Sequence, residues 1–327
     1  MHTALRVTLL AGVVLAAAPA LTLAHGGTVA APAFPGVLLA WRLEAAVLLP
    51  LAGGAIGWLL VVRRVASAHP GHPPSPWRSA AFLGGLAVIG VALTSPIEAY
   101  EGQLFSVHML QHMLLQLVAA PLLLLGAPPT MALRAASPSV RRMLLAILHS
   151  RAVAILSFPL LAWVLFAAVN WGWHFSSLYD QALETPWLHD LQHVTFLAAA
   201  LLFWWPVVGV DPARWRLPHP VRLFYLFLAM PQNSFLGVAL MGAPPSLYPH
   251  YVSNARNWGP TPLVDQQVGG TLMWVGGDVV FLLAMGLVVA AWVRAEDRRT
   301  AREDARLALP PSASDPGTGT AGRRPGN

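Results

Sequence analysis

The sequence predicts an all-α protein, a polytopic bundle of transmembrane helices with seven spans after a signal-like N-terminal segment. Composition is the first reason, because 56% of the 327 residues are hydrophobic and only 10% are charged, whereas soluble domains carry about 25% charged residues. The second reason is that apolar runs of spanning length, roughly 20 residues, recur along the chain. We therefore expect one membrane domain, although length alone would suggest two soluble ones.

Residues 1–24 form the first element. Arg6 precedes an apolar stretch over 7–23, and Thr22-Leu23-Ala24 offers a small-x-small cleavage site. This pattern is typical of a secretory signal peptide, and the alternative is an extra N-terminal helix that is not cleaved. In both cases Arg6 stays in the cytoplasm, so the residues after position 24 begin outside.

Seven further segments approach the length needed to cross a hydrocarbon core, and together they define a transmembrane domain over residues 25–293. We expect these spans near residues 37–62, 79–95, 104–125, 152–171, 187–208, 222–242 and 268–293.

Arginine placement orients the bundle. All 20 basic residues are Arg. Arg6 is expected in the cytoplasm, and only Arg42 and Arg256 fall on the predicted outer side. The connections after the first, third and fifth spans and the C-terminal tail hold the others: Arg63, Arg64, Arg78, Arg134, Arg141, Arg142, Arg151, Arg214, Arg216, Arg222, Arg294, Arg298, Arg299, Arg302, Arg306, Arg323 and Arg324. This bias predicts a multi-pass membrane protein with a cytoplasmic C-terminus, and it removes the need for a nucleic-acid partner.

The tail over 294–327 is Arg-rich and largely disordered by prediction, because its later part lacks apolar periodicity. Its beginning, 294–306, is expected to continue the last helix into water. The chain has no Cys, so any metal must be bound by His, Met or carboxylate groups. The sequence also contains no phosphate-binding loop, no dinucleotide-binding motif and no Gly-x-Ser-x-Gly nucleophile elbow. Because these catalytic motifs are missing, we do not expect an enzyme.

Two His pairs are the strongest functional signal. His108 and His112 lie four residues apart in the third span, and His189 and His193 repeat this spacing in the fifth. Residues at i and i+4 share one helix face. Both spans enter the membrane from outside, so the two pairs should occupy one layer of the outer leaflet. The alternative is four His residues that only form hydrogen bonds between helices.

Four imidazoles near thioethers, with no thiol available, suit copper or zinc, and Met favours Cu(I). Met109 and Met113 lie beside the first pair and are second-rank ligands. His174 is either a fifth ligand or a residue of the membrane interface. Asp278, inside the seventh span, would be costly without a partner; it either orients a ligating His or pairs with a structural Arg or Gln.

Several motifs resemble the CtaG family of bacterial cytochrome c oxidase assembly factors, over about residues 95–275. They are Ser95-Pro96 with Tyr100, Phe105-Ser-Val-His108-Met-Leu-Gln-His112, Pro121-Leu-Leu-Leu-Leu-Gly126-Ala-Pro128, Trp173-His174 with Tyr179, Ala182-Leu183 and Pro186, His189-x-x-x-His193, Phe203-Trp204-x-Pro206, Leu236-Gly237, Leu247-Tyr248-Pro249-x-Tyr251, and Asp265-Gln266-x-x-Gly269-Gly270-x-x-Met273-Trp274.

The resemblance implies a multi-pass protein of the bacterial plasma membrane that is needed to make a caa-type oxidase and that has a role in copper delivery. Its implied partners are oxidase subunits, with an extracytoplasmic copper chaperone as a further candidate. Two other readings stay open. One is a haem- or quinone-binding redox protein, because His residues on facing helices can ligate haem. The other is an assembly scaffold without metal.

Overall fold

The computed structural model describes residues 31, 35–212, 214–254 and 256–307. The proposed signal segment 1–24 and the tail beyond 307 lie outside these residues. The described residues contain helices and turns but no strand, which confirms the all-α prediction.

The helices are α2 (Ala45–Ala68), α3 (Pro76–Thr94), α4 (Pro96–Tyr100), α5 (Phe105–Met113), α6 (Ala120–Leu125), α7 (Pro128–Ala135), α8 (Pro138–Leu148), α9 (Arg151–Leu156), α10 (Pro159–His174), α11 (Ser177–Glu184), α12 (Pro186–Val208), α13 (His219–Gly242), α14 (Pro249–Ser253), α15 (Pro262–Thr271) and α16 (Gly277–Leu307). The 3₁₀ turns are η1 (Gly36–Leu39) and η3 (Pro245–Leu247). Two π turns, η2 (Leu114–Ala119) and η4 (Leu272–Gly276), continue α5 into α6 and α15 into α16.

Six helical segments of the described chain are long and apolar enough to cross a membrane, so the protein is a multi-pass membrane protein. The predicted fourth span, 152–171, is the one that falls short. It is split at Ser157 into α9 and α10 because Pro159 begins a new helix. The 16 residues of α10 reach only about 24 Å at 1.5 Å per residue. A seventh crossing therefore depends on α10 and stays a prediction.

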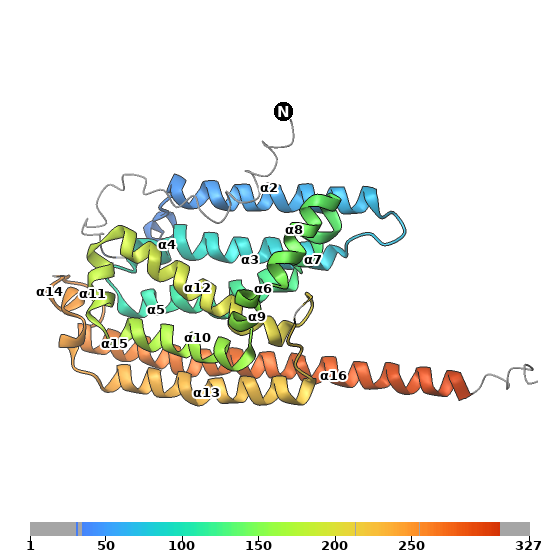
Figure 1. Ribbon diagram of the computed structural model, residues 1–327. Helices are drawn as coiled ribbons and strands as arrows, with labels where there is room; N and C mark the ends of the chain where they lie inside the picture. Colours follow the sequence, from blue (N-terminus) through green and yellow to red (C-terminus); the bar gives the residue numbers. More distant parts are fainter. Residues whose placement is uncertain (1–30, 32–34, 213, 255, 308–327) are drawn as a thin grey trace, which may run out of the picture.

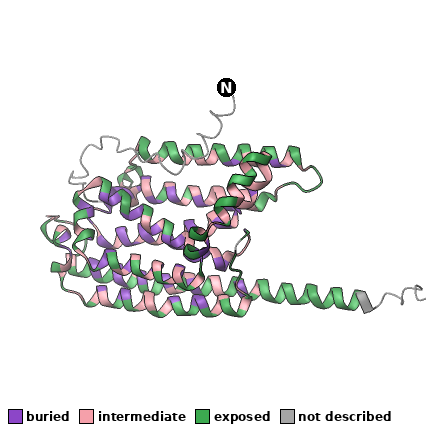
Figure 2. Ribbon diagram, viewed as in Figure 1, coloured by how far each residue is buried: buried purple, intermediate pink, exposed green. Residues whose placement is uncertain are grey.

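The boundaries of the first and last spans also differ from expectation. Gly36–Leu39 form a 3₁₀ turn, and α2 begins only at Ala45. The backbone N–H of Arg42 donates to the Thr94 carbonyl at 2.8 Å, which fixes residues before α2 to the end of α3. At the C-terminal side α16 continues to Leu307, as predicted for 294–306; its residues 291–305 are exposed, and the helix extends past the others (Figures 1 and 2).

The long helices run side by side and alternate in direction, so their connections gather at two ends (Figure 1). The acidic end comprises residues 95–104, 175–185 and 243–261, with α4, α11 and α14. The basic end comprises 69–75, 126–158, 209–218 and the extension of α16. These names follow the charges of the connections, since carboxylates predominate at the first end and Arg at the second.

Glycines let helices approach closely in the half of the bundle near the acidic end. A Cβ added at Gly237 would lie 2.7 Å from the Gly270 carbonyl oxygen, and one at Gly270 would lie 2.7 Å from the Gly237 oxygen. A Cβ at Gly269 would lie 2.4 Å from a ring atom of Phe105. Small residues at a helix contact let backbones come together in a membrane bundle. These contacts set α5, α13 and α15 in a tight group.

Candidate metal centre

Helix α5 carries the first His pair, and a residue far along the chain fixes where it begins. Its own N-cap, Leu104, provides no side-chain cap. Instead, the Asp265 carboxylate accepts hydrogen bonds from the backbone N–H of Phe105 at 2.7 Å and from the Ser106 hydroxyl at 2.5 Å. Arg256 balances this buried carboxylate, with an N–O distance of 3.7 Å. A carboxylate at a helix N-terminus is favourable, so α15 fixes the start of α5.

The two His pairs meet in the interior between α5 and α12. His108 is fully buried, and His112, His189 and His193 are at most 9% exposed. The ring centres of His108 and His189 lie 5.1 Å apart, and those of His112 and His193 lie 5.6 Å apart. Each pair therefore turns its shared face toward the other helix, and all four imidazoles lie at one level of the bundle.

Three of these residues form a group with metal-site spacing. One ring nitrogen from each of His108, His189 and His193 lies within 4.8 Å of the others, in a fully buried setting. The Nε2 atoms of His108 and His112 are 2.8 Å apart. Two nitrogens bound to one ion at about 2.0–2.1 Å, as in zinc sites, lie about 3 Å apart. The spacing of the imidazoles therefore fits a shared ion.

Hydrogen bonds orient His108. Its Nδ1 lies 3.0 Å from the Tyr251 hydroxyl, which donates its own proton to the Glu101 carbonyl. An N–H at Nδ1 of His108 would therefore donate to the Tyr251 hydroxyl oxygen, and Nε2 would hold the lone pair of the ring. Nδ1 of His112 is buried without a hydrogen-bond partner among the described residues. Nε2 of His108 then accepts the 2.8 Å hydrogen bond from the Nε2–H of His112, so the unused lone pair lies on Nδ1 of His112, and a cation bound by both Nε2 atoms would replace the hydrogen bond between the rings.

Glu101 is the functional candidate that the sequence reasoning missed. One carboxylate oxygen, Oε2, lies 3.2 Å from Nδ1 of His108 and 3.9 Å from Nε2 of His189. Burial raises the pKa of this carboxyl group well above its ordinary range; nearby Glu98 raises it further, whereas Arg42 lowers it. Glu101 lies in a connection outside any helical pattern, so the only signal available was its acidic character just before the His pair.

His174 and Met109 form a second contact beside the cluster. Nε2 of His174 lies 3.3 Å from the Met109 sulfur, and both residues are fully buried. Nδ1 of His174 lies 2.7 Å from the Asn170 carbonyl, which fixes the ring. The His174 ring centre is 6.1 Å from that of His112. The structure thus places a nitrogen and a thioether next to the four-His cluster.

The other two predicted candidates are held elsewhere. The Met113 side chain packs toward the π turn η4, where a Cβ added at Gly276 would lie 3.0 Å from its terminal methyl. Asp278 accepts a hydrogen bond from the Ser234 hydroxyl at 2.8 Å. His250 lies in the short helix α14, and its Nε2 contacts the Gly102 carbonyl at 2.9 Å.

Comparison with known proteins shows the family to which the chain belongs. The family model for the cytochrome c oxidase caa3 assembly factor, Caa3_CtaG, matches residues 56–295. The chain belongs to this family. The resemblance seen in the sequence is thereby confirmed, and the matched region contains all of the His, Met and Asp candidates.

Three curated proteins that resemble this chain are longer mycobacterial proteins. Two, from Mycobacterium bovis and Mycobacterium tuberculosis, are each 34% identical over 285 residues, which cover 84% of this chain and 42% of the relative. One from Mycobacterium leprae is 30% identical over 275 residues, which cover 81% of this chain and 41% of the relative. All three are described as uncharacterised. The chain spans about two fifths of the length of these curated relatives, and no solved structure matches it.

Proposed function

We propose that this protein is a membrane-embedded copper-binding assembly factor, without enzymatic activity, that helps deliver copper to cytochrome c oxidase. One observation carries the proposal: three buried His residues bring ring nitrogens within 4.8 Å of one another in a member of an oxidase assembly factor family. Copper is the cargo. The ligands proposed for it are His108, His112, His189 and His193, with His174 and Met109 beside them.

The chemistry of the donors supports copper. Imidazole nitrogens suit copper and zinc, and an adjacent thioether favours Cu(I). Met109 supplies that thioether next to His174. Met113 and Asp278 contribute less to this proposal, because their contacts go to Gly276 and Ser234. Zinc remains the competing metal, and a loading experiment with both ions separates them.

The charge distribution supports the entry of copper from the outer side of the membrane. If the Arg-rich connections lie in the cytoplasm, then the His cluster lies in the outer leaflet of the bacterial plasma membrane. The acidic end would then face incoming copper, and clustered negative charge raises the local concentration of cations. An extracytoplasmic copper chaperone would supply the ion there, and an oxidase subunit would receive it.

Release follows from the arrangement of ligands. The donors come from two helices, and a further nitrogen–sulfur pair lies beside them, 6.1 Å from His112 between ring centres. An ion bound by several exchangeable His and Met groups can change ligands one at a time. We therefore propose stepwise transfer, without a redox step.

The test compares the metal content of purified wild type with that of His108→Ala and His193→Ala after loading with Cu(I) and, separately, with zinc. His149→Ala is the matched control, because His149 is an exposed residue at the basic end. Wild type and control should retain copper, and both cluster variants should lose most of it. Equal copper in all four proteins would overturn the site.

The same samples separate the two other readings. A Soret band in the absorbance spectrum of wild type would replace copper delivery by haem binding. Wild-type oxidase assembly by a His108→Gln, His193→Gln double variant that holds no metal would indicate a scaffold. Loss of both metal and oxidase assembly in this double variant supports copper delivery.

A further inference from the structure

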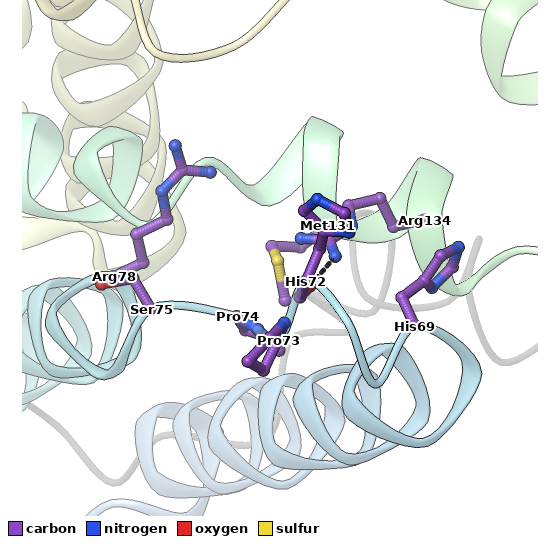
Figure 3. Close-up of a pocket in the computed structure, with 8 residues that line it drawn as sticks. All are labelled: His69, His72, Pro73, Pro74, Ser75, Arg78, Met131 and Arg134. Carbon is purple, nitrogen blue, oxygen red and sulfur yellow. Dashed lines mark hydrogen bonds between the residues drawn. The ribbon is translucent and has the colours of Figure 1, made fainter.

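A second polar site lies at the basic end, away from the His cluster. A cavity of about 510 Å³ opens between the end of α2, the start of α3 and α7. Its walls are His69, His72, Pro73, Pro74, Ser75, Arg78, Met131 and Arg134, and Figure 3 shows them around the loop that joins α2 to α3. The proposed copper function uses none of these residues.

The cavity favours an anion. Two Arg side chains and two imidazoles line it, and no Asp or Glu is among the described lining residues. A guanidinium N–H of Arg134 donates to the His72 carbonyl, which holds the side chain in place (Figure 3). An Arg has five N–H donors, and Arg134 forms no ion pair with the described residues. Its charge is therefore left for a ligand.

Two further groups add to this charge. Ser75 is the N-cap of α3, a helix of 19 residues, and its hydroxyl does not bond to the helix. A helix N-terminus carries partial positive charge that attracts anions. Arg78 lies one turn later and is close enough to Asp211 for its charge to act on that carboxyl group. Because Asp211 partly balances Arg78, Arg134 is the principal cation of the cavity.

The walls and position fit a phosphate group near the membrane surface. Pro73 and Pro74 limit the motion of the loop, and the buried Met131 forms an apolar surface. The candidate spans Ala45–Ala68 and Pro76–Tyr100 end and begin at this loop. Trp77 beside it is 61% exposed, and Trp is enriched where proteins meet the lipid interface.

We propose that this cavity binds a phosphate group through Arg134, with Arg78, Ser75 and the start of α3 in support. Basic pockets between transmembrane helices on the cytoplasmic side can hold anionic lipid headgroups. The phosphate can come from such a headgroup or from free inorganic phosphate. The proposal is independent of the copper site, because the two sites use different residues at opposite ends of the bundle.

The experiment titrates delipidated protein in a neutral detergent with two probes, a short-chain phosphatidylglycerol and inorganic phosphate, and follows binding by calorimetry. The proteins are wild type, Arg134→Gln, Arg134→Lys and Arg78→Gln. Arg142→Gln is the matched control, because Arg142 is exposed at the same end and loses the same charge.

Arg134→Gln should weaken binding about tenfold or more, which is the effect expected when a charge-assisted hydrogen bond is lost. Arg78→Gln should weaken it less, Arg134→Lys should recover part of it, and Arg142→Gln should match wild type. Binding of the phosphatidylglycerol but not of inorganic phosphate identifies a lipid headgroup. Binding of inorganic phosphate with the same affinity as the lipid identifies free phosphate. No binding to wild type, or equal binding to Arg134→Gln and Arg142→Gln, would overturn the proposal.

Discussion

The acidic and basic ends of the bundle hold polar side chains in opposite ways. At the acidic end they are buried and bound to groups far away in sequence: Tyr251 contacts His108 across 143 positions, and Asp265 caps α5 across 160. At the basic end the Arg side chains are mostly exposed, and Ser150 caps α9 locally; the exception is the buried Asp211, which accepts the Thr130 N–H at the start of α7 across 81 positions. A substitution should therefore disturb fold and site together at the first end and act locally at the second.

The largest effect is expected for Asp265→Ala. This change removes the cap of α5 and leaves Arg256 without its partner. Loss of one member of a buried ion pair costs about 3–5 kcal/mol. Thermal unfolding in detergent should show a large fall in Tm, with loss of copper from the His cluster. An unchanged Tm would show that α5 does not depend on its distant cap.

Gly237→Ala comes next. The added Cβ would lie 2.7 Å from the Gly270 carbonyl oxygen, a backbone atom that cannot rotate away. Overpacking of this kind costs about 1–3 kcal/mol. Gly286→Ala in α16 is the control, because nothing lies within 4 Å of its added Cβ. If the two variants unfold at the same temperature, the close approach of α13 and α15 is not important for stability.

Glu101→Gln tests the charge beside the imidazoles. The amide keeps an oxygen near Nδ1 of His108 but removes a carboxyl group that can ionise when a cation binds beside it. We expect copper affinity to fall about tenfold, or about 1.4 kcal/mol, with little change in Tm. Glu184→Gln is a control from the same end, since Glu184 is an exposed carboxylate. Equal affinities for both variants and wild type would exclude a role for the Glu101 charge.

The smallest effect is expected at the basic end. Ser150→Ala removes a hydroxyl that accepts the Val153 N–H at 3.2 Å. Loss of an N-cap costs about 1 kcal/mol, and copper binding should not change. Ser139→Ala, a change at an exposed residue of α8, should leave Tm as in wild type. A loss of copper in Ser150→Ala would contradict the separation of the two ends.

The sequence predicted the parts of the site that follow helical periodicity. His108 with His112 and His189 with His193 share faces at i and i+4, and the structure brings the two faces together. Glu101, Tyr251 and the cap Asp265 could not be found this way. Tyr251 and Asp265 have partners in distant parts of the chain, and Glu101, although close to His108 in sequence, lies before α5 and outside its periodicity.

Departures from regular helix geometry explain the remaining differences. Pro159 divides the predicted fourth span, and the connection to Thr94 delays the start of α2. Asp278 follows the π turn Leu272–Gly276. A π turn uses i→i+5 hydrogen bonds, so a uniform period of 3.6 residues does not give the direction of side chains beyond it.

The two π turns have a consequence for how the chain tolerates changes in length. Leu114–Ala119 separates the first His pair from α6, and Leu272–Gly276 separates the cap Asp265 from α16. Deleting one residue in either turn would restore regular winding and rotate one half of the helix against the other by about 100°. Every ligand would still be encoded, yet the His pair would face a different neighbour. Metal content of a Leu114 deletion would show whether the centre depends on this extra residue, which an alignment would record only as a gap.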